Sequence, residues 1–83
     1  MIKTIARIML TDNDQPVMMA YDTELPFVLQ EGACIRLHSQ GEVYEIKDVF
    51  YDLPINTLDI LLEPMNYIGS VKEHLSLGWY LAL

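Results

Sequence analysis

Residues 33–63 read ACIRLHSQGEVYEIKDVFYDLPINTLDILLE and contain three strand-like runs separated by two polar breaks. Each run contains apolar residues spaced two positions apart, which is the period of a strand with one buried face. The runs are 33–38, 43–51 and 58–63. Segment 39–42 is polar and contains one glycine, as expected for a hairpin loop between the first two runs. This stretch therefore predicts a β-rich domain.

The middle run changes the face that carries its apolar residues. Tyr44 and Ile46 have one parity, whereas Val49 and Tyr51 have the other. One extra residue in the strand, a β-bulge, returns all four side chains to the same face. We place this bulge at 47–48. Bulges bend strands, and small closed barrels need such bends.

The segments before and after this stretch supply the remaining elements. Residues 3–10 and 16–21 predict a hairpin around the polar turn 11–15. Ser70 and Glu73 have the spacing of a capping box, in which the two side chains satisfy unpaired backbone donors at a helix start.

The C-terminal part allows two interpretations. The capping box predicts a short helix over 71–77 that ends at Gly78. Segment 74–77 also alternates, so a pair of strands is the alternative. The residues 79–83, WYLAL, are apolar and would form a sticky edge in water. We expect them to pair with the domain's own sheet or with a second copy across a two-fold axis.

Together these elements predict one domain over residues 1–83 that is all-β or mainly-β. We expect a strongly bent antiparallel sheet of five to six strands that closes into a small Src-homology-type (SH3-like) barrel, with one short C-terminal helix. The predicted core consists of strand residues: Ile5, Ile8, Ile35, Leu37, Tyr44, Ile46, Val49, Ile60 and Leu62.

The net charge of −7 is unevenly distributed. Residues 1–21 and 64–83 each sum to zero, so the whole deficit lies in 22–63. Direct binding of nucleic acid needs a basic footprint and is not expected. Hydrophobic residues make up 52% of the chain, which is more than a core of this size easily buries. The excess predicts a protein partner, and a homodimer is one such partner.

No catalytic or cofactor pattern is recognisable. Ser39 follows His38, but adjacent residues of a strand point in opposite directions, so no nucleophile has a neighbouring base. His38 and His74 are interpreted as surface or boundary residues, and Cys34 as a small strand residue. We therefore expect neither an enzyme nor a metal or other cofactor. One cysteine, no signal-peptide pattern and no apolar run of ~18 residues predict a cytoplasmic protein that does not bind membranes.

Two groups of residues are candidates for binding a partner. The first is an acidic stripe, which we expect on the outward side of the sheet and at the bulge and end of the middle strand: Glu45, Asp48, Asp52, Asp59 and Glu63. The second is a set of aromatic side chains: Tyr51, Trp79 and Tyr80. A solvated face that only keeps an apolar protein soluble is the simpler interpretation of the stripe.

Three functions remain open. The first is a non-catalytic interaction module that binds a protein through an apolar and aromatic patch and the acidic stripe. The second, by analogy alone, is a phage-type acidic inhibitor, similar to an anti-CRISPR protein, that mimics nucleic acid and occupies the binding site of a basic host defence protein. The third is a small-ligand-binding barrel. Salt weakens electrostatic mimicry steeply, but weakens an apolar interface little.

Overall fold

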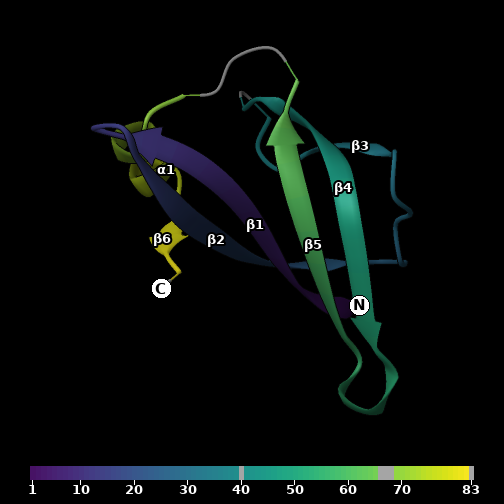
Figure 1. Cartoon of the computed structure of the whole chain (residues 1–83). Coiled ribbons are helices and arrows are strands. Elements are labelled where there is room, and N and C mark those ends of the chain that lie inside the picture. Colours follow the sequence, from purple (N-terminus) through teal and green to yellow (C-terminus); the bar gives the residue numbers. More distant parts are fainter. Residues whose placement is uncertain (40, 66–68, 83) are drawn as a thin grey trace.

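The computed structural model describes residues 1–39, 41–65 and 69–82 (Figure 1). The described chain is mainly β, as predicted, with one short α-helix. Its elements are β1 (Ile2–Asp12), β2 (Gln15–Leu25), β3 (Cys34–Arg36), β4 (Val43–Asp52), the 3₁₀ helix η1 (Leu53–Ile55), β5 (Thr57–Pro64), α1 (Val71–Ser76) and β6 (Tyr80–Leu81).

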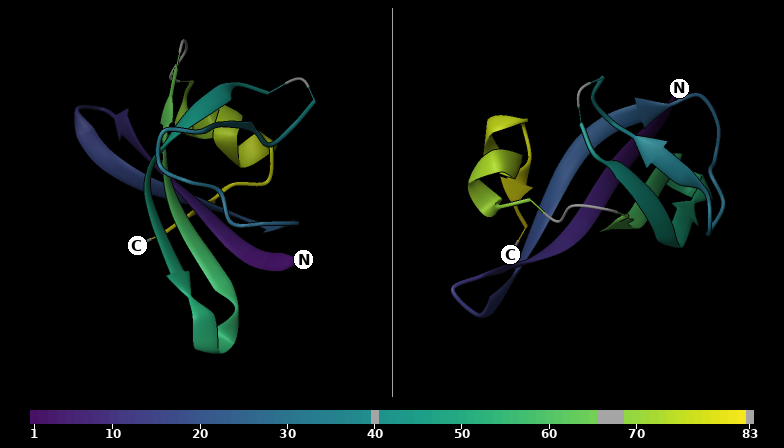
Figure 2. Two further views of the ribbon diagram at one scale, coloured as in Figure 1. Left: turned by 90° about the vertical axis from the view of Figure 1, so that its right-hand side faces the viewer. Right: turned by 90° about the horizontal axis from the view of Figure 1, so that it is seen from above.

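The strands form one mixed sheet with the order β3-β4-β5-β1-β2-β6. The prediction of a wholly antiparallel sheet is wrong in one place, because β1 and β5 pair in parallel. Alternation within a strand shows which face is buried but does not show the direction of its neighbour. Among the described residues no pairing joins the outer strands β3 and β6, so the predicted closure into a barrel is not observed. The sheet is instead strongly twisted, and β1 and β2 cross β4 and β5 at a steep angle (Figures 1 and 2).

The first hairpin is longer than predicted. β1 and β2 pair without interruption from Ile2↔Leu25 to Asp12↔Gln15. Asn13 and Asp14 form the two-residue loop, with φ angles of 51° and 62°. Two successive positive φ angles are typical of a type I′ turn, whose twist matches that of the strands. Pairing can therefore continue to both ends of the hairpin.

The predicted β-bulge is present in β4. Ile46 pairs with Leu62 and Val49 with Ile60, while the register shifts between Ile46 and Asp48. Lys47 is the extra residue. As a result, the apolar residues on both sides of the bulge face the same side of the sheet, as their parities required.

The capping-box prediction of a helix is also confirmed. Ser70 Oγ accepts a hydrogen bond of 3.1 Å from the backbone N–H of Glu73 at the start of α1. Gly78 follows the helix with a φ of 98°, a conformation that favours glycine. The chain then enters β6, which pairs with β2 of the same chain. The C-terminal residues described here are thus paired with the domain's own sheet.

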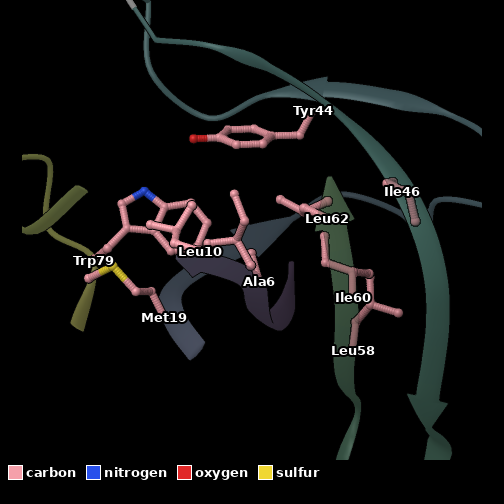
Figure 3. Packing of buried hydrophobic residues seen from close by; sticks show 10 residues of the cluster. Ala6, Leu10, Met19, Tyr44, Ile46, Leu58, Ile60, Leu62 and Trp79 are labelled. Atoms are coloured by element: carbon pink, nitrogen blue, oxygen red, sulfur yellow. The ribbon is translucent and has the colours of Figure 1, made fainter. Parts of the chain in front are cut away.

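The core lies on the concave side of the sheet (Figure 3). Five of the predicted core residues are buried: Ile8, Tyr44, Ile46, Ile60 and Leu62. Ile35, Leu37 and Val49 are half-buried and pack against them. Ile5 was assigned wrongly, because Thr4, Ala6, Ile8 and Leu10 are the buried residues of β1 and Ile5 has the opposite parity.

An aromatic cluster closes one end of the core. The ring of Trp79 lies 5.5 Å from Tyr21, 5.9 Å from Tyr44 and 5.4 Å from His74, measured between centroids. His74 is 3% exposed, so its interpretation as a surface or boundary residue is wrong. His38 is half-buried, and its ring lies 4.9 Å from that of Tyr21. Tertiary contacts from distant segments bury these residues, and no local pattern signals them.

Candidate partner-binding face

The convex side of β1, β2, β4 and β5 is called the outer face here. It carries the strand residues that alternate with the buried core residues. Their positions follow from the strand registers. The outer face comprises Lys3, Ile5, Arg7 and Met9 of β1; Met18, Ala20, Asp22 and Glu24 of β2; Thr57, Asp59, Leu61 and Glu63 of β5; and Glu45, Lys47, Asp48, Phe50 and Asp52 of β4. It therefore contains all five residues of the predicted acidic stripe.

Two acids of the stripe lie directly opposite each other. Glu45 and Glu63 are Cα partners across β4 and β5. Like charges in such a pair repel. The bulged Lys47 places its Nζ 3.4 Å from Glu45 and 3.7 Å from Glu63, so one cation bridges both carboxylates. The hydrogen bond to Glu45 and the nearby negative charges raise the pKa of Lys47.

A third acid of the stripe is paired with Arg7. The guanidinium of Arg7 donates through Nε and Nη2 to Asp59, with N···O distances of 3.0–3.2 Å. Such a forked geometry is the stronger form of this interaction. The hydrogen bond to Asp59 raises the pKa of Arg7. Asp59 therefore has a structural role in joining β5 to β1.

Asp48 and Asp52 differ from the other three. Asp48 is exposed beside the bulge, where its Oδ1 accepts a hydrogen bond of 3.0 Å from the N–H of Val49. Asp52 is the last residue of β4. Within the described ranges neither carboxylate forms an ion pair. Among the described residues, these two are the acids of the stripe that lack a counter-charge.

Apolar side chains lie among these charges. Phe50 is 66% exposed and lies opposite Asp59. Leu61 is 37% exposed and lies between Asp48 and Arg7 in the register. Met9 is half exposed, and together with Leu61 and Lys47 it lines a hollow on this face.

The apolar surface continues onto the turn between β4 and β5. This turn projects from the body of the protein (Figures 1 and 2). Leu53 is 73% and Ile55 is 66% exposed. The turn is held by a hydrogen bond from the N–H of Asn56 to the carbonyl of Leu53 at 3.2 Å and by one from the hydroxyl of Tyr51 to the side chain of Asn56. Its exposed side chains are thus presented by a defined backbone.

The three aromatic candidates lie in different places. Tyr80 is on the outer side at β6, where its hydroxyl donates to Asp22 Oδ1 over 2.6 Å, and this hydrogen bond raises the pKa of Tyr80. Tyr51 is half-buried on the core side. Trp79 is 3% exposed, so its selection as a surface contact is corrected: its ring completes the core.

Sequence analysis missed Phe50 and Leu61 as candidate contacts, although both were visible in the pattern. Phe50 lies between Val49 and Tyr51, and Leu61 between Ile60 and Leu62. Each is therefore an apolar residue with the parity of the charged face. An apolar side chain at such a position lies outside the core and is a candidate for contact with another molecule where several of them form a patch.

Within the described residues, no group of three His, Cys, Asp or Glu side chains is placed to hold a metal ion. In that same part of the chain, no helix is long and apolar enough to cross a membrane. The geometry thus defines a small mainly-β domain with one charged and partly apolar sheet face. Comparisons with models of protein families, with curated proteins and with solved structures found no significant match to this chain.

Proposed function

We propose that this protein is a non-catalytic interaction module that binds a basic protein partner through the outer face. The observation that carries the proposal is the position of Phe50, which is 66% exposed on a strand between two acids, Asp48 and Asp52. A large aromatic ring in water makes no contribution to the core. Surrounded by polar groups, it has the character of an interface hot spot.

The charge of the outer face selects the kind of partner. Acids outnumber bases among its residues, and Lys47 and Arg7 are already engaged with acids of the same face. Asp48 and Asp52 thus remain to attract lysine or arginine side chains of a partner. The adjacent Leu53 and Ile55 extend the apolar part of the surface.

An inhibitor that mimics nucleic acid is the second candidate. The row of carboxylates on β4 and β5 supports it, because such a row resembles a line of phosphates. The lysine and arginine bridges make three of these acids less like bare phosphates. We therefore rank this function below the general interaction module. We do not develop the small-ligand barrel, since buried core side chains occupy the concave side and aromatic rings close one end of it.

The test begins with identification of the partner and ends with measured affinities. A photo-crosslinking amino acid at position 50 is used to trap partners in a cell lysate, and the trapped protein is then purified. Calorimetry compares wild type with Phe50→Ser. We expect a loss of affinity of at least about tenfold. Phe27→Ser is the matched control, because Phe27 is 60% exposed and lies in the loop before β3.

A second pair of variants tests the charges. Asp48→Asn with Asp52→Asn should weaken binding at low salt and reduce its salt dependence. Asp12→Asn with Glu31→Gln removes the same number of charges away from the outer face and should have a smaller effect. Equal effects of the two pairs would show that net charge alone matters. If nucleic acid competes with this protein for the partner, the mimic becomes the better description.

A further inference from the structure

We infer that β6 at the open edge of the sheet is a docking site for a second copy of this chain, paired antiparallel across a two-fold axis. This inference concerns a different surface from the outer face and does not depend on the function proposed above. It rests on the hydrogen-bond pattern of β6, on the apolar side chains around it and on the local balance of charge.

The hydrogen-bond pattern leaves one residue of β6 facing the open edge. Ala82 donates from its N–H to the carbonyl of Met18 over 2.9 Å. In an antiparallel ladder, hydrogen-bonded and non-hydrogen-bonded pairs alternate. Leu81, which pairs with Met19, is therefore a non-hydrogen-bonded partner of β2. Its N–H and C=O point away from β2, toward the edge of the sheet.

A strand edge of this kind is self-complementary. Two copies related by a two-fold axis can place Leu81 opposite Leu81, and each N–H then donates to the carbonyl of the other copy. The two sheets would continue across the axis. β-strand addition of this type is a common mode of recognition, in which backbone bonds supply affinity and adjacent side chains supply specificity.

Partly exposed apolar side chains occur on β6 and on the helical segment that precedes it in the chain. Leu75 is 48%, Leu77 is 43% and Leu81 is 50% exposed. A hollow that includes Leu81 is lined mainly by apolar residues of β1, β2, α1 and β6, among them Val17, Met18 and Val71, and by one acid, Asp12. An edge strand with apolar neighbours invites pairing with another chain unless it is blocked.

The charges favour a second copy over a basic partner at this edge. Residues 69–82 contain Lys72 and Glu73 and no other Lys, Arg, Asp or Glu, so the segment is neutral although the chain carries −7. Two acids of the neighbouring strands lie beside it: Asp22 accepts the hydrogen bond from the Tyr80 hydroxyl, and Asp12 lines the hollow. Two copies can approach here with little repulsion. The other edge strand, β3, carries the charged Arg36 and follows the loop that contains Glu31, and charged residues of this kind protect a sheet edge.

The experiment measures the mass of the full chain in solution by sedimentation equilibrium over a wide range of concentration. Wild type is expected to form a dimer. Leu81→Pro removes the edge-facing N–H but leaves the bonds to β2, and Leu81→Lys places a charge at the axis. Both should raise the dimer dissociation constant at least about tenfold. Val28→Lys, which places the same charge at an exposed apolar residue outside both surfaces, should leave the dimer unchanged.

Two additional readouts complete the test. Far-UV circular dichroism establishes whether each variant is folded, and Leu81→Lys serves if Leu81→Pro fails to fold. In wild type, the amide hydrogen of Leu81 should exchange more slowly as protein concentration rises. The inference is overturned if wild type is a monomer at every concentration or if its dimer is unaffected by Leu81→Lys. Protection of Leu81 only in the presence of another protein would also overturn it, since the edge then accepts a heterologous strand.

Discussion

The hydroxyl of Tyr44 donates a hydrogen bond to Nε2 of His74 over 3.1 Å, and both residues are buried. Nδ1 of His74 lies 2.9 Å from the carbonyl of Ser70, which can only accept, so Nδ1 carries the ring hydrogen. Nε2 is therefore free to accept from Tyr44. This chain of bonds joins β4 to the start of α1 and fixes the helix against the sheet.

The burial of Tyr44 predicts a loss of stability in alkali. Burial, with a smaller contribution from the charge of Glu42, raises the pKa of Tyr44 above 10.0. The unfolded chain therefore releases this proton at a lower pH than the folded chain. The stabilisation is present below pH 10.0 and is lost as pH rises through the folded pKa.

Tyr44→Phe tests this relationship. At neutral pH it should lower the free energy of unfolding by roughly 1–3 kcal/mol, because it leaves the buried Nε2 of His74 without a donor. Above pH 10.0 the difference between wild type and variant should shrink. Urea unfolding at both pH values provides the measurement. If the free energies of unfolding of the two proteins change in parallel with pH, the raised pKa does not belong to Tyr44.

The bulge places Ile46 and Phe50 on opposite faces of the same strand. Ile46 is fully buried and Phe50 is 66% exposed. We expect Ile46→Ala to lower the free energy of unfolding by about 2–5 kcal/mol. Phe50→Ala, which removes the larger side chain, should change it by only about 0.5 kcal/mol. A similar loss for both variants in denaturant melts would show that the two faces have been assigned wrongly.

The same charge reversal should change the free energy of unfolding differently at Asp59 and at Asp48. Asp59→Lys replaces the partner of Arg7 by a like charge and should lower the free energy of unfolding by about 1 kcal/mol, with the loss reduced by salt. Asp48→Lys should change it by about 0.5 kcal/mol or less, since Asp48 has no ion pair within the described part of the chain. Thermal melts of both variants at low and high salt provide the measurement. Equal losses of stability would show that Asp59 has no special role in joining β5 to β1.

The sequence allowed prediction of features that depend on neighbouring residues. The parity change between Ile46 and Val49 indicated the bulge, and Ser70 with Glu73 indicated the helix start. The parallel pairing of β1 with β5 was not predictable, because it depends on which strands become neighbours after the chain has passed through β2, β3 and β4. Ile5 was placed in the core because β1 has apolar residues of both parities.

The candidate site, too, was predictable only where neighbouring residues of the sequence decide the position of a side chain. Glu45 has the parity opposite to Tyr44 and Ile46, which placed it outward. The salt bridge of Arg7 with Asp59 joins residues 52 positions apart, so no local pattern could reveal that Asp59 is already engaged. Trp79 was taken for a surface contact because an aromatic residue near the C-terminus has no local signal of burial.

The burial of Trp79 leads to a prediction with its own spectroscopic readout. Trp79 is the only tryptophan of the chain and is 3% exposed. Its fluorescence should therefore be blue-shifted in the folded protein and poorly quenched by iodide. An emission maximum typical of water and efficient quenching would show that the ring lies at the surface. Trp79 would then again be a candidate for contact with a partner.

Two substitutions separate the contribution of the Trp79 ring from that of its N–H group. Trp79→Ala removes the contacts with Tyr21, Tyr44 and His74 and should cost about 3–5 kcal/mol, a large part of the stability of a small domain. Trp79→Phe keeps an aromatic ring and removes a buried Nε1–H that has no hydrogen-bond acceptor among the described residues. Because an unsatisfied buried donor is unfavourable, the loss of this group offsets part of the lost volume. Trp79→Phe should therefore unfold at a denaturant concentration much closer to wild type than to Trp79→Ala, and near-equal losses would indicate that Nε1 has a partner in solution.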